Sequence, residues 1–182
     1  MDWTAQLLDQ LDWHWTNHLR PRLDGLTDEE YFWEPVPGCW NVRRREEADP
    51  AKAHGSGDYV IEYEWPEPAP PPVTTIAWRL GHIIVGIFGT RSHRHFGAPE
   101  TDYDKQRYAG TAKEALAQLD AGYAHWTSGV RSLSADDLAR PVGPAEGAFA
   151  DHPMAALVLH INREVIHHGA EIALLRDLYL RR

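Results

Sequence analysis

The stretch HINREVIHHGAE occupies residues 160–171, inside the last long apolar-periodic segment of the chain, 154–179. On an α-helix of about 3.6 residues per turn, His160, Glu164 and His168 stack along one ridge. The neighbouring stripe is apolar and consists of Leu157, Ile161, Val165, Ile172, Leu175 and Tyr179. The ridge therefore lies on, or at the edge of, the helix face that should point into a core.

A carboxylate in such a position needs a partner, because burying an unpaired charge is costly. The i, i+4 spacing lets Glu164 and His168 reach one metal ion, and the two residue types are common zinc ligands. Two alternatives remain open from spacing alone. Glu164 and His168 can form an ordinary helix-surface pair, or the ridge can face outward if the helix boundaries differ from those expected.

Composition favours one globular domain spanning residues 1–182. Hydrophobic residues make up 43% and charged residues 25% of the chain, and 182 residues are enough for a sizeable core. The eight tryptophans and 11 histidines are unusual. The surplus of histidine favours a site for metal binding or proton transfer.

Charge and cysteine content exclude several other classes. The formal net charge of −9 argues against a nucleic-acid binder, despite the short basic run 43–45. A single cysteine, Cys39, allows no intrachain disulfide framework and fits a reducing compartment. The first residues resemble no signal peptide, and no run approaches the roughly 20 apolar residues of a membrane span. We therefore expect a cytoplasmic protein that binds neither nucleic acid nor membrane.

Apolar periodicity predicts four long helices, at 3–20, 76–88, 111–130 and 154–179. Pro21 should stop or kink the first helix, and Thr74 or Thr75 can cap the second. The second helix is apolar on nearly all sides and should be the most buried. This pattern predicts an all-α fold, a four-helix bundle, and bundles commonly build metal sites from facing helices.

The connection between the first two helices is a long excursion, 41–72, that ends in a Pro-rich stretch. A connection of this length is unusual in a compact domain. We expect it to be ordered over the mouth of the bundle, because Trp40, Tyr59 and Trp65 can be buried, with 59–65 as a short extended segment. The alternative is disorder of part of 46–57.

Other histidines compete for the role of metal ligand. His82 lies in the middle of the second helix and is either a satisfied core residue or a ligand. His14 and His18 form a rival i, i+4 pair, although neither has a carboxylate beside it on the same ridge. His93 follows His82 by three turns, about 16 Å along the helix, and cannot join the same ion; His95 points elsewhere.

Two motifs in this order resemble the DinB/YfiT-like superfamily. They are TIAWRLGHI at 75–83 and the pattern His-x3-Glu-x3-His-x7-Arg at 160–176, accompanied by the segment 38–40. Members of this superfamily are four-helix bundles that hold a divalent metal, often zinc or nickel, with one side chain from helix two and two from helix four. The resemblance implies that His82, Glu164 and His168 are the ligands. Many members have His in place of Glu164, and the Glu version is similar to that of mycothiol-dependent maleylpyruvate isomerase.

Three protein ligands leave an open coordination position, where a divalent ion can bind water or a thiol and lower its pKa. The resemblance favours a thiol-dependent transferase or isomerase over a hydrolase, with a small-molecule substrate and a low-molecular-weight thiol as co-substrate. The alternative is a bundle that binds metal or a small ligand without turnover. A homodimer is also compatible with a Trp-rich bundle.

Four further residues flank the expected ligands. His160 and His167 can orient a ligand or transfer protons, and the alternative for each is an ordinary surface histidine. Arg79 and Arg176 can bind an anionic substrate or the acidic groups of a thiol cofactor, and the alternative for each is a solvated or structural charge.

Overall fold

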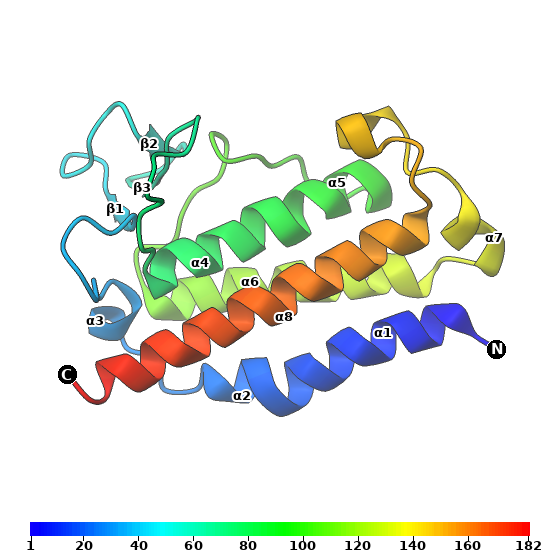
Figure 1. The fold of residues 1–182 in the computed structure, drawn as a ribbon, viewed down its shortest axis with the longest axis horizontal. Coiled ribbons are helices and arrows are strands. Elements are labelled where there is room, and N and C mark those ends of the chain that lie inside the picture. The colour runs from blue at the N-terminus through cyan, green and yellow to red at the C-terminus, as the bar shows by residue number, and fades with distance from the viewer.

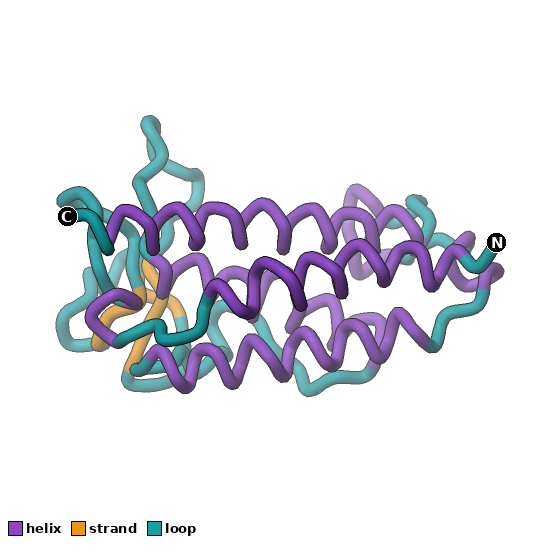
Figure 2. The backbone as a smooth tube through the Cα atoms, turned by 90° about the horizontal axis from the view of Figure 1, so that it is seen from below, coloured by secondary structure: helices purple, strands orange, loops and turns teal.

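The computed structural model describes residues 1–182 and shows a mainly helical chain with four long helical segments (Figures 1 and 2). Two of them are interrupted by π-helical turns. The first consists of α1 (Trp3–His14), η1 (Trp15–Leu19) and α2 (Arg20–Arg22); the second of α4 (Ile76–His82), η2 (Ile83–Gly89) and α5 (Thr90–Phe96); the third is α6 (Ala112–Arg131); and the fourth is α8 (Met154–Tyr179). The prediction of an all-α chain is confirmed at this level.

The long helical segments lie side by side and share one core. α1 packs against both α6 and α8, and η2 also packs against both α6 and α8. The cluster of 30 buried hydrophobic residues takes side chains from all four segments, among them Leu11, Ile83, Trp126 and Ile161, each 0% exposed. As expected, η2 is the most buried segment, with a buried residue at every position from Ile83 to Phe88. None of the helices combines the length and the apolar character that crossing a bilayer requires.

The excursion 41–72 is ordered around a small antiparallel sheet. Its strands are β1 (Val42–Arg44), β2 (Ala53–His54) and β3 (Tyr59–Glu62), in the order β1-β3-β2. Val60 and Ile61 of β3 are buried, and Trp40 is buried beside the sheet. The expectation that Trp65 helps to anchor the excursion is wrong, because its side chain is 89% exposed. The extended segment predicted at 59–65 is shorter, because the chain leaves the sheet after Glu62.

The sheet is tied to the start of α4 through Thr75. This side chain accepts a hydrogen bond from the Trp78 amide, at 3.2 Å, as an N-cap should, and donates one to Asn41 Oδ1, at 2.7 Å. The Trp78 indole in turn donates to the Glu62 carbonyl of β3 at 2.7 Å. These bonds fix the first turn of α4 and therefore the direction in which its later residues point.

Short elements complete the chain. α3 (Asp28–Tyr31) follows the first long segment, and α7 (Ala135–Ala139) and the 3₁₀ turn η3 (Pro144–Phe149) lie between α6 and α8. In Figure 1, the sheet and η3 lie at opposite ends of the second helical segment, and α8 runs the whole distance between those ends. The middle of α8 therefore lies beside the second helical segment, about halfway between the sheet and η3.

Candidate metal centre

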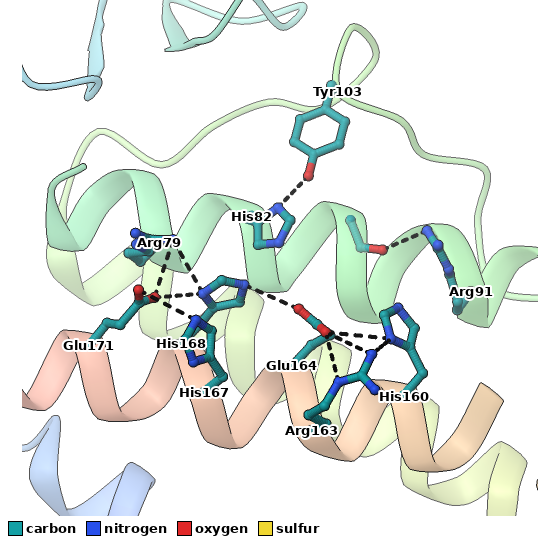
Figure 3. Close-up of polar contacts among 11 residues, drawn as sticks. Arg79, His82, Arg91, Tyr103, His160, Arg163, Glu164, His167, His168 and Glu171 are labelled. Atoms are coloured by element: carbon teal, nitrogen blue, oxygen red, sulfur yellow. Dashed lines mark hydrogen bonds and ion pairs between the residues drawn. The ribbon is translucent and has the colours of Figure 1, made fainter. Parts of the chain in front are cut away.

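Three side chains from two helices meet between α4 and α8 (Figure 3). His82 ends α4, while Glu164 and His168 lie one turn apart on α8, and one ligand atom of each lies within 4.8 Å of the others. His168 Nε2 is 3.5 Å from Glu164 Oε2, and the His82 and His168 rings meet edge to face with centroids 4.7 Å apart. His168 is buried, whereas His160 and Glu164 are partly exposed, so the ridge lies at the edge of the core-facing side of the helix.

The ring of His168 is held from its far side by Glu171. His168 Nδ1 lies 2.7 Å from Glu171 Oε2, and Arg79 contributes an NH1 group 3.2 Å from the same oxygen. A carboxylate accepts hydrogen bonds, so Nδ1 carries the proton and Nε2 keeps its lone pair toward Glu164 and His82. Arg79 NH1 also lies 3.3 Å from His168 Nδ1, so Arg79 contacts both the ring and the carboxylate that orients it.

His82 is held in a similar way by Tyr103. The Tyr103 hydroxyl lies 2.6 Å from His82 Nδ1, and Figure 3 shows the other ring nitrogen turned toward α8. The Trp78 ring stacks on the other side of the imidazole, with centroids 5.4 Å apart. Gly86 makes the contact possible, because a Cβ at this position would lie 2.3 Å from the Tyr103 hydroxyl.

Burial keeps both imidazoles neutral. Desolvation, with smaller contributions from His168, Arg79 and Arg91, lowers the pKa of His82 to about 3. Desolvation also lowers the pKa of His168, against the opposing effect of its hydrogen bond to Glu171. Two neutral imidazoles and one carboxylate with free lone pairs are a ligand set that fits a divalent metal ion.

Comparison with known families agrees with this geometry. The family model described as the DinB superfamily matches residues 10–172, which is most of the chain. The chain belongs to the DinB superfamily. No curated protein and no solved structure gives a match.

A second group of possible ligands overlaps the first in this DinB-superfamily protein. It consists of His167, His168 and Glu171, and His167 Nε2 lies 3.5 Å from Glu171 Oε1. His168 would offer Nδ1 to this group but Nε2 to Glu164 and His82, so one neutral ring cannot serve both. The side chain of His167 is 63% exposed, whereas that of Glu164 is 22% exposed. The group around His82 is therefore the more shielded from solvent, and we regard it as the better candidate for a metal site.

The two flanking histidines lie in different surroundings. His160 Nδ1 is 3.4 Å from Glu164 Oε1, and Arg163 NH2 lies 2.6 Å from that ring nitrogen, so His160 contacts the carboxylate of the expected ligand. His167 contacts the outer carboxylate of Glu171, and its ring centroid lies 4.9 Å from that of His168. Of the two, His160 is the one positioned to affect Glu164.

Arg176 is not brought to the cluster, although the sequence suggested a substrate-binding role. Its Nε and NH2 groups donate to the two carboxylate oxygens of Glu30 at 2.6 and 3.0 Å, and NH1 donates to the Asp24 carbonyl at 3.0 Å. Glu30 is only 2% exposed. The bidentate pair ties the end of α8 to α3, which is the structural alternative for this arginine.

The remaining candidates lie elsewhere. His14 and His18 stack with ring centroids 6.0 Å apart and join no group of three ligands. His93 Nδ1 faces the Ala98 carbonyl at 2.9 Å, and His95 Nε2 faces Glu146 at 3.1 Å. Cys39 is buried, and burial raises the pKa of its thiol, which makes it a poor nucleophile.

Tyr103 and Glu171 contact the candidate ligands His82 and His168, and the sequence patterns did not single them out. Glu171 follows His168 by three residues, so helical spacing could have predicted that the two side chains meet. Tyr103 lies in the irregular connection between α5 and α6, where no periodicity relates it to His82. Only the three-dimensional course of that connection brings its hydroxyl to the ring.

Proposed function

We propose that this DinB-superfamily protein is a four-helix-bundle metalloprotein that binds one divalent ion, zinc or nickel, through His82, Glu164 and His168. We further propose that it is a thiol-dependent transferase or isomerase acting on a small electrophile. The observation that supports the proposal is the convergence of three ligand atoms within 4.8 Å, two of them on imidazoles that burial keeps neutral.

A divalent ion with three protein ligands would supply an open coordination position and lower the pKa of a thiol or water molecule bound there. The residues of the chain have supporting tasks. Glu171 holds the proton at His168 Nδ1, and Tyr103 fixes the ring of His82. Outer contacts of this kind keep the ligand nitrogens aimed at one point. His160 contacts Glu164 and is partly exposed, so it is suited to exchange protons between the site and solvent.

The reacting thiol must come from outside the chain. The single cysteine, Cys39, is buried and its thiol donates to the Val36 carbonyl at 3.0 Å. A thiol-dependent reaction at His82 therefore requires a small thiol as co-substrate. A binding protein without turnover is the second candidate, and the same ligand geometry would serve it.

Metal analysis of protein purified without a polyhistidine tag tests the proposal. We expect near-stoichiometric metal in the wild type and in His167→Gln, and its loss in His82→Gln, Glu164→Gln and His168→Gln. Loss of metal in His167→Gln with retention in His82→Gln would instead identify the group around Glu171. Turnover of electrophiles such as 1-chloro-2,4-dinitrobenzene by the metal-loaded protein with a small thiol then tests catalysis. Full metal content without turnover across a broad panel would favour the binding protein.

A further inference from the structure

A pocket of about 350 Å³ lies beside the candidate metal centre, between α5, η3 and the first half of α8. Arg91 contributes one wall, Glu146 and Phe149 of η3 a second, and Leu157, His160 and Arg163 of α8 a third. Its volume is within the usual range of small-molecule sites. The His160 side chain lies between the pocket and the site, because its Nδ1 is 3.4 Å from Glu164 Oε1.

Arg91 and Glu146 of the pocket lining belong to a cluster with an excess of positive charge. Arg91 Nε, Arg94 NH1 and His95 Nε2 lie 3.5, 3.4 and 3.1 Å from the carboxylate of Glu146. The Glu146 side chain is only 6% exposed. One carboxylate cannot neutralise two guanidinium groups, so a net positive charge remains beside the pocket. That excess is notable in a chain whose net charge is −9.

Arg91 has hydrogen-bonding capacity that the protein does not use. Its NH1 group donates to the Gly86 carbonyl at 2.9 Å, and its buried Nε, which makes no hydrogen bond, faces the Glu146 carboxylate at 3.5 Å. A guanidinium offers five N–H donors in a planar fork that matches a carboxylate. The NH2 group of Arg91 donates to no atom of the protein, so a ligand carboxylate in the pocket can accept from that group.

The remaining walls suit an organic rather than an inorganic anion. Val142, Phe149 and Leu157 place apolar surface along the pocket, and Phe149 is 64% exposed although it is a large aromatic residue. Such a combination of apolar walls and a few convergent polar groups is typical of small-ligand sites. An anion with an apolar body can use both features at once.

We propose that this pocket binds a carboxylate-bearing organic substrate, with Arg91 as the specificity-determining residue that receives the carboxylate. The apolar part of the substrate lies against Phe149 and Leu157, and His160 borders both the pocket and Glu164 of the candidate metal centre. The assignment of this ligand as the electrophile rests on the proposed function. The binding of the anion itself requires only the pocket.

The test is ¹⁹F NMR titration of metal-free protein with 4-fluorobenzoate and with the neutral analogue 4-fluorobenzyl alcohol. We expect 4-fluorobenzoate to bind more tightly than the alcohol and more tightly than inorganic phosphate, measured as a competitor. Arg91→Gln should weaken 4-fluorobenzoate binding about tenfold or more, because hydrogen bonds to a charged group are lost. Arg94→Gln is the matched control. It also removes one positive charge beside the Glu146 carboxylate, but Arg94 does not line the pocket.

A second variant tests the pocket independently, in case Arg91→Gln does not fold. Ala156 lines the pocket, so Ala156→Phe should fill it and abolish binding without changing any charge. Equal weakening by Arg91→Gln and Arg94→Gln, unchanged binding in Ala156→Phe, or tighter binding of phosphate would overturn the proposal. Arg91-dependent binding in a protein that takes up no metal would support the pocket while refuting the proposed function. Metal uptake combined with 4-fluorobenzoate binding that does not depend on Arg91 would support the proposed metal site and refute the pocket.

Discussion

The Tyr103 hydroxyl lies 2.6 Å from His82 Nδ1 and thereby ties the connection between α5 and α6 to a residue in the middle of the second helical segment. The tie fixes the rotation of the ring, because the imidazole is stacked on Trp78 at the same time. The hydroxyl can donate to Nδ1 or accept from it, and when it accepts, the nitrogen that faces α8 keeps its lone pair. A residue remote in sequence therefore holds the orientation of the proposed ligand.

Removing this hydroxyl should weaken metal binding. For Tyr103→Phe we expect the affinity for zinc to fall about 10- to 100-fold, the usual effect of losing an outer hydrogen bond to a histidine ligand. Competition with a chromophoric chelator measures the change. Tyr123→Phe is the control, because this hydroxyl bonds to Asp12, outside the site, at 2.6 Å. Equal affinities for Tyr103→Phe and the wild type would show that the tie does not position His82.

A methyl group at Gly86 should have the same effect by a different route. The added Cβ would lie 2.3 Å from the Tyr103 hydroxyl oxygen, so the Tyr103 ring must move away from His82. We expect Gly86→Ala to lower zinc affinity as Tyr103→Phe does, despite the gain of about 1 kcal/mol that alanine offers in a helix. Combining the two substitutions should cost little more affinity than either alone, because both break one contact. Additive losses would contradict a shared cause.

Regular helical spacing predicts the helices and places Glu164 and His168 on one ridge, whereas the resemblance to the DinB/YfiT-like superfamily is what adds His82 to the expected ligands. Glu164 and His168 are one turn apart, and the apolar stripe beside them turns that ridge toward the second segment and His82. Contacts made by irregular segments have no such rule. Tyr103 reaches His82 from a connection without periodicity, and Trp65 leaves the sheet for solvent although its type favours burial.

Protonation of His82 should make the metal-free protein less stable in acid. Its pKa is lowered to about 3 in the folded protein, against the usual 6.5 of a histidine, so the unfolded chain binds the proton more readily between these values. The stabilisation is complete above pH 6.5 and is lost progressively as the pH falls toward 3, at up to about 1.4 kcal/mol per pH unit.

Urea denaturation between pH 7 and 5, in the presence of a chelator, measures this dependence while most carboxylates stay ionised. His82→Gln cannot bind the proton in either state, so its stability should fall less steeply with acidification than that of the wild type. The comparison removes contributions from the other titrating groups, which both proteins share. Parallel curves for the two proteins would mean that His82 is not held neutral by its surroundings.

Arg176 should matter for stability and not for the metal. It forms a bidentate pair with Glu30, whose side chain is 3% exposed, and Arg176→Met would leave that carboxylate buried without a cation. We expect a loss of about 3–5 kcal/mol in the free energy of unfolding, the usual consequence of breaking a buried pair. Glu30→Gln combined with Arg176→Met should recover part of it, since no charge is then left unpaired. Urea denaturation of the single and double variants, with metal content measured in parallel, separates the two roles. A stable Arg176→Met protein with impaired binding of an anionic substrate would restore the substrate role that the sequence suggested.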